Sequence, residues 1–130
     1  MNAPDDQAVE LFAAARRDRV TYRILRRDAE APIETTMFHA QQVAEKVIKA
    51  VLVQHGVVFR RTHDLIELLD LAGAHSIEVP VIRDLLLRLG PYAVEFRYLG
   101  VRAPEIGAEE ADKAVASLMA WVSTVLGISE

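Results

Sequence analysis

Residues 38–69 carry most of the side chains in this sequence that could do chemistry. Gln42, Glu45 and Lys49 recur every three or four positions, so they share one side of a helix if the stretch is helical. Glu45 precedes Lys49 by four residues, which is the favourable order for an ion pair. On a solvated face the pair would be an ordinary surface contact. On a face turned toward another helix or subunit, Gln42 and Lys49 could meet an anionic ligand.

A second polar group follows, in the segment Thr62-His63-Asp64-Leu65. Thr62 is predicted to cap a helix, and Asp64 in its first turn suits the positive end of the helix dipole. His63, next to the cap, could contact a ligand, or it could simply be packed and hydrogen-bonded. His39 and His63 together would supply only two metal ligands, so we predict no metal site.

Composition excludes several classes of protein. The 130 residues are 52% hydrophobic, enough for the core of one domain spanning residues 1–130. The lack of cysteine rules out disulfides, thiolate metal sites and cysteine nucleophiles. No apolar run has the roughly 20 residues that a membrane span needs, and the polar, acidic N-terminus does not resemble a signal peptide. We therefore expect a cytoplasmic protein, and with no phosphate-cradling glycine loop we expect no cofactor.

Charge is unevenly distributed along the chain. The net charge of -4 argues against non-specific binding to nucleic acid. One early segment is nevertheless rich in arginine: Arg16, Arg17, Arg19, Arg23, Arg26 and Arg27. These residues fit either solvated helix faces or a basic face for nucleic acid. The acidic cluster near residues 105–112 suits a helix N-terminus.

The elements that must position these side chains are all helical. The apolar spacing and short loops predict an all-α fold, an antiparallel bundle of four to five helices. The expected helices run from Asp5 or Asp6 to about Asp28, from Glu34 to Gly56, from Thr62 to Leu71, from Pro80 to Leu89, and from about Ala108 onward. Residues 92–99 are expected to continue the fourth helix or to form a packed turn, and residues 100–107 to form a loop.

Apolar spacing also predicts which side of each long helix faces the core. In the first helix this side is Val9, Phe12, Ala13, Val20, Ile24 and Leu25. In the second it is Ala40, Ala44, Val47, Ile48 and Val51. In the last it is Ala111, Ala114, Val115, Leu118, Trp121, Val122 and Val125.

Three motifs occur in a specific order. They are F-H-A-Q-Q-x-A-E-K at residues 38–46 followed by K-A at 49–50, R-T-H-D-L at 61–65, and Tyr92 with Arg97-Tyr98. In this order they resemble the HEPN family, named for the higher eukaryotes and prokaryotes nucleotide-binding domain. The resemblance covers nearly the whole chain.

The resemblance implies an up-and-down helical bundle that often dimerises. Many small members of the family form a complex with a minimal nucleotidyltransferase, sometimes as a toxin–antitoxin pair, and other members are metal-independent ribonucleases. The ligand-binding residues that it favours here are Gln42, Lys49, Arg97 and Tyr98, followed by Asp64 and His63.

The ribonuclease signature of the family is an arginine followed, after four to six residues, by a histidine. None of the four histidines, His39, His55, His63 and His75, has an arginine at that spacing upstream. Cleavage of RNA needs a placed proton-transfer group, usually histidine. We therefore predict a non-catalytic, homodimeric binding module that engages a small nucleotidyltransferase, a nucleotide, or both. The alternatives are a ribonuclease with a non-standard site and a purely structural interaction subunit.

Two interpretations remain open for Arg97 and Tyr98. Arg97 could hold a phosphate through two hydrogen bonds while Tyr98 stacks on a base. Alternatively, Arg97 pairs with a carboxylate such as Glu45 or Asp64, and Tyr98 packs in the core. The family often has proline after this dipeptide, where the present chain has Leu99, so the turn is less fixed.

Overall fold

The computed structural model describes residues 3–93 and 106–130. These two ranges contain five α-helices, one 3₁₀ helix and no strand, so the all-α prediction is confirmed. The helices are α1 (Asp6–Arg27), α2 (Ile33–Gln54), α3 (Leu65–Ala74), α4 (Arg83–Leu89), the 3₁₀ helix η1 (Gly90–Ala93) and α6 (Ala108–Leu126). The predicted continuation of the fourth helix begins as η1, and residues 94–99 lie outside the described ranges, as does most of the predicted loop at 100–107.

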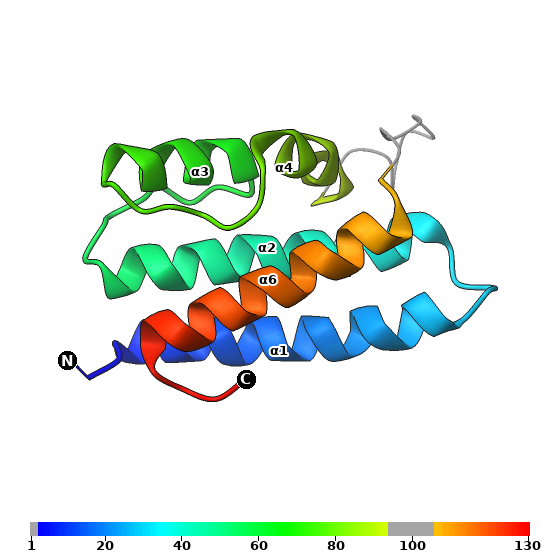
Figure 1. The fold of residues 1–130 in the computed structure, drawn as a ribbon, viewed down its shortest axis with the longest axis horizontal. Coiled ribbons are helices and arrows are strands. Elements are labelled where there is room, and N and C mark those ends of the chain that lie inside the picture. Colours follow the sequence, from blue (N-terminus) through cyan, green and yellow to red (C-terminus); the bar gives the residue numbers. More distant parts are fainter. Residues whose placement is uncertain (1–2, 94–105) are drawn as a thin grey trace.

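The helices stack in three layers (Figure 1). α1 forms one side, α2 and α6 the middle, and α3 with α4 the other side. α1 runs antiparallel to both α2 and α6 (Figure 1). α2 is the central helix, because it contacts α1, α3, α4, α6 and η1.

α2 is buried around almost its whole circumference. The predicted core side is confirmed, since Ala40, Ala44, Val47, Ile48 and Val51 are all buried. Gln41 and Glu45 are buried as well, because the chain leading into α3 covers the opposite side of the helix. These two polar side chains of α2 therefore lie between elements of the bundle.

The predicted core side of α1 is only partly confirmed: Phe12 is buried, and Val9, Ala13 and Leu25 are partly buried. Val20 and Ile24 are 54% and 61% exposed, so their assignment to the core was wrong. The buried side contains Ala8, Phe12, Ala15 and Tyr22. Tyr22 replaces the two aliphatic residues because its hydroxyl reaches a carboxylate on α6 while its ring packs inside.

Helix ends follow local capping chemistry. Asp5 caps α1, as predicted, by accepting from the backbone N–H groups of residues 7 and 8. α3 is capped by Asp64 instead of Thr62, and it begins at Leu65. The Asp64 carboxylate accepts from Ile66 N and Glu67 N, whereas the Thr62 hydroxyl accepts from Asp64 N one step earlier.

Two further helix boundaries differ from the predictions. α3 runs through Gly73 to Ala74. α4 begins at Arg83, three residues after Pro80, with Ile82 in the N-cap position.

In the described parts of the chain, no helix combines the length and apolar character needed to cross a bilayer.

Candidate functional site

The Glu45 carboxylate is the centre of a buried polar cluster. Its side chain is only 6% exposed. Oε2 receives an ion pair from Lys49 Nζ at 3.1 Å, and Oε1 lies 3.0 Å from His63 Nδ1. The Gln41 side-chain amide adds a weaker contact to Oε1 at 3.3 Å. Glu45 and Lys49 therefore form the ion pair that helical spacing predicts. The alternative that placed this pair on a solvated face is wrong, because both side chains are largely buried.

α2 and the start of α3 position this cluster together. Gln41, Glu45 and Lys49 lie one turn apart along α2, so their side chains follow one side of that helix. Gln41 also donates to the backbone carbonyl of His63, which ties the segment before α3 to α2. Gln42 joins the cluster indirectly, because its amide donates to Gln41 Oε1 at 2.7 Å.

His63 is the cluster member most open to a ligand. Its side chain is 63% exposed although Nδ1 contacts the buried carboxylate. An ionised carboxylate can only accept, so Nδ1 is the donor in this contact, and Nε2 is the ring nitrogen that does not contact Glu45. This arrangement fixes the tautomer and orientation of the ring in the way that carboxylates do in general-base pairs.

A pocket of about 340 Å³ adjoins His63. It lies between the first turn of α3 and the end of α4 with η1, and its lining includes His63, Asp64 and Leu87. Asp64 faces this pocket while its carboxylate caps α3, so the residue holds the rim of the pocket in place. Most of the remaining lining is apolar.

The structure brings three of the six predicted binding residues to Glu45 or to the adjoining pocket. Lys49 and His63 contact Glu45, and His63 and Asp64 line the pocket. Gln42 is one step removed, through its hydrogen bond to Gln41. Arg97 and Tyr98 lie outside the described residues. The positive charge of Lys49 is neutralised by Glu45, and its ammonium also lies 5.9 Å from the centre of the Phe59 ring. The described cluster therefore offers hydrogen-bonding atoms more than net positive charge.

A second ionic cluster between α1 and α2 was not predicted. Asp18 on α1 contacts His39 Nδ1 at 3.1 Å and also pairs with Lys46 Nζ. His39 and Lys46 stand two turns apart on α2, a spacing visible in the sequence, but the acid that joins them is on another helix.

In the described ranges no group of three histidine, aspartate or glutamate side chains is arranged to hold a metal ion.

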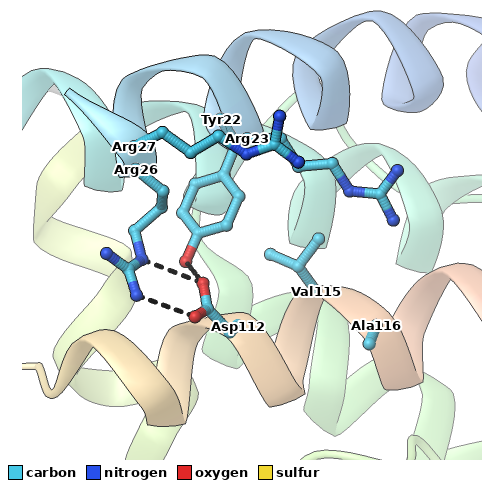
Figure 2. Close-up of a pocket in the computed structure, with 7 residues that line it drawn as sticks. All are labelled: Tyr22, Arg23, Arg26, Arg27, Asp112, Val115 and Ala116. Atoms are coloured by element: carbon cyan, nitrogen blue, oxygen red, sulfur yellow. Dashed lines mark hydrogen bonds and ion pairs between the residues drawn. The ribbon is translucent and has the colours of Figure 1, made fainter.

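A third cluster links α1 to α6. Arg26 holds the Asp112 carboxylate with two hydrogen bonds, of 2.9 and 2.8 Å, and the Tyr22 hydroxyl donates to the same carboxylate at 2.6 Å (Figure 2). The Arg26 hydrogen bond is the main reason that the pKa of Asp112 lies below its ordinary value. Burial, followed by the hydrogen bond to Asp112, raises the pKa of Tyr22.

Comparison with known proteins gives one finding. A family model described as HEPN domain matches residues 8–125, which takes in all but the outermost residues of α1 and α6. No curated protein and no solved structure matches the chain. The resemblance drawn from the three sequence motifs is confirmed at the level of the family.

Proposed function

This chain belongs to the HEPN domain family, and on that premise we propose that it is a non-catalytic binding module. It acts in the cytoplasm as a single-domain homodimer that engages a small nucleotidyltransferase, a nucleotide, or both, as in a toxin–antitoxin pair. The observation that supports this proposal is that His63 contacts the buried Glu45, together with Lys49, and also lines a pocket of about 340 Å³ beside Asp64. Gln42 lies next to this cluster through its hydrogen bond to Gln41.

The described part of the site suits a polar, largely neutral surface. The His63 side chain is exposed, and the Gln42 carbonyl oxygen has no hydrogen-bond partner among the described residues. Such groups recognise base edges or the polar surface of a partner protein. In this proposal Arg97 supplies the positive charge for a phosphate, and Tyr98 supplies the ring that stacks on a base.

Native mass spectrometry tests the proposal without knowledge of the ligand. The protein is measured alone and with a panel of mono-, di- and trinucleotides, as the parent chain and as the variants His63→Ala and Arg97→Ala. His75→Ala is the matched control, because His75 is also exposed but lies at the other end of α3. We expect a dimer that retains a nucleotide, with the adduct lost in His63→Ala and Arg97→Ala and kept in His75→Ala.

Two outcomes would contradict this proposal. A monomer at all concentrations would remove the homodimer. A dimer that retains no nucleotide and forms no complex with a small nucleotidyltransferase would remove the binding function. Binding of a nucleotidyltransferase that is equal with and without nucleotides would leave only the partner-binding arm, which is the purely structural interaction subunit.

The contact between Glu45 and His63 favours a second candidate, a ribonuclease with a non-standard site. His63 Nε2 would take the proton of a 2′-hydroxyl, with the ring oriented by Glu45. The 2′-oxygen would attack the adjacent phosphorus, and the departing 5′-oxygen would take a proton from solvent.

Cleavage of a mixed RNA substrate in the presence of a metal chelator tests this second candidate. Activity that survives stringent purification, disappears in His63→Ala and persists in His75→Ala would establish it. Activity that is equal in the two variants would show that the cleavage does not come from His63.

A further inference from the structure

A pocket of about 370 Å³ lies between α1 and α6 (Figure 2). It is lined by Tyr22, Arg23, Arg26, Arg27, Asp112, Val115 and Ala116. The pocket therefore combines three arginines with one carboxylate and an apolar wall from α6. No residue of the proposed His63 site belongs to it.

The carboxylate in this pocket, Asp112, already has partners within the protein. Asp112 receives two hydrogen bonds from Arg26 and one from Tyr22. Arg26 and Asp112 thus neutralise each other, and their pairing uses the Nε and one Nη of Arg26. The remaining Nη of Arg26 is left to donate elsewhere.

Arg23 and Arg27 are different, because neither has a hydrogen bond or an ion pair with another described residue. Both are exposed, and Figure 2 shows their side chains directed away from the Asp112 carboxylate. They stand four residues apart on α1, a spacing at which like charges repel each other and destabilise the helix. Arg27 in the last turn compensates the helix dipole, but Arg23 lies more than a turn from the helix end.

Arg23 and Arg27 line the pocket and have no carboxylate partner among the described residues. Two such guanidinium groups favour an anion with several oxygens. The planar fork of arginine matches the oxygens of a phosphate, which accept two parallel hydrogen bonds. The pocket volume is at the lower end of the range for small-molecule sites. Val115 and Ala116 provide an apolar wall against which the organic part of such a molecule could pack.

We propose that this pocket binds a small phosphorylated molecule. Arg23 and Arg27 hold the phosphate, and Val115 and Ala116 contact the organic group. Asp112 is a positioning residue, because it fixes Arg26 at the edge of the pocket and does not touch the ligand. The inference goes beyond the proposed function, since it assigns a second site that does not depend on His63, Arg97 or a protein partner.

Isothermal titration at constant ionic strength tests this inference, with adenosine monophosphate and inorganic phosphate as probes. The test variant is Arg23→Gln/Arg27→Gln. The matched control is Arg60→Gln/Arg83→Gln, which removes the same charge from two exposed arginines elsewhere. We expect adenosine monophosphate to bind at least about 10-fold more weakly to the test variant than to the control, because two charge-assisted hydrogen bonds are lost. Far-ultraviolet circular dichroism checks that both variants keep the helical content.

Several results would overturn the inference. Equal weakening in both double variants would show a diffuse effect of charge without a site. Loss of binding in His63→Ala but not in Arg23→Gln/Arg27→Gln would place the ligand at the His63 site instead. Equal affinity for phosphate and adenosine monophosphate would contradict the contact with Val115 and Ala116. Binding that survives in His63→Ala and fails only in the arginine variant supports this pocket even if the proposed function fails.

Discussion

At the scale of single residues, Glu45 places a buried carboxylate on the central helix α2. A buried carboxylate costs several kcal/mol unless charged and hydrogen-bonding partners compensate it. Here Lys49, His63 and Gln41 all contact it, from α2 itself and from the chain entering α3. The cluster therefore fixes the position of His63 relative to α2.

The first prediction concerns the charge of Glu45. Glu45→Gln keeps the shape but leaves the largely buried Lys49 ammonium without its counter-charge, so we expect a loss of about 2–4 kcal/mol in the free energy of unfolding. Urea denaturation measures this loss. The control Asp70→Asn breaks an exposed pair with Arg83 and should change stability by no more than about 0.5 kcal/mol. Equal effects of the two substitutions would show that burial of the Glu45 pair has no energetic weight.

The second prediction concerns acid stability and Asp112. Its pKa in the folded chain is lowered, mainly by the hydrogen bond from Arg26, so the ionised form favours folding. This contribution is present above the unfolded pKa of about 3.9 and is lost as pH falls through the lower folded value. Urea midpoints measured between pH 2.5 and 6 should fall more steeply for the parent chain than for Asp112→Asn. Parallel curves would contradict the prediction.

The residue types at the site were readable from the sequence, but their relations were only partly so. The Glu45–Lys49 pair follows from helical spacing, because both residues belong to one helix. The contacts of Glu45 with His63, and of Asp18 with His39 and Lys46, join residues from different elements. Periodicity within one element holds no information about such contacts, so they appear only in the structure.

At the scale of elements, the short chain segment before α3 determines where the His63 pocket forms. Thr62 and Asp64 act in sequence, the hydroxyl accepting from Asp64 N and the carboxylate accepting from the first free N–H groups of α3. The sequence contained both capping residues but not their order of use, since either residue type can serve as an N-cap. For α1, the two exposed aliphatic residues fit the helical period as well as the buried tyrosine does, so spacing alone could not select the buried side.

The third prediction tests the cap of α3. Asp64→Ala should reduce the free energy of unfolding by about 1 kcal/mol, because two backbone N–H groups lose their acceptor. Asp64→Asn should cost only a few tenths of that, since its amide oxygen can still accept. Thermal or urea unfolding distinguishes the two variants. An unchanged stability in Asp64→Ala would mean that Thr62 provides the effective cap.

At the scale of the whole molecule, α2 is the central element, because every other described helix packs against it. Its neighbours cover it on both sides, whereas α4 lies in an outer layer (Figure 1). Leu87 in α4 and Ile82 just before it are exposed to solvent. The all-helical bundle and the start of the last helix at Ala108 were predictable from the sequence, because long amphipathic segments and strong breakers leave few alternatives.

The fourth prediction follows from this difference in burial. Amide hydrogens in the middle of α2 should exchange with solvent most slowly, and those of α4 faster, because α2 can open only when the whole bundle opens. Hydrogen exchange followed by mass spectrometry or NMR measures the order. Protection in α4 equal to that in α2 would show that the α3–α4 layer opens together with the rest.

The short link between α1 and α2 has a consequence for how the chain reaches this fold. Only residues 28–32 separate the two 22-residue helices, so their extensive interface closes a small loop. Contacts that are close in sequence form early, since little chain entropy is lost before they stabilise the structure. We therefore expect the α1–α2 hairpin to form first, and α6, which is distant in sequence, to dock onto it afterwards.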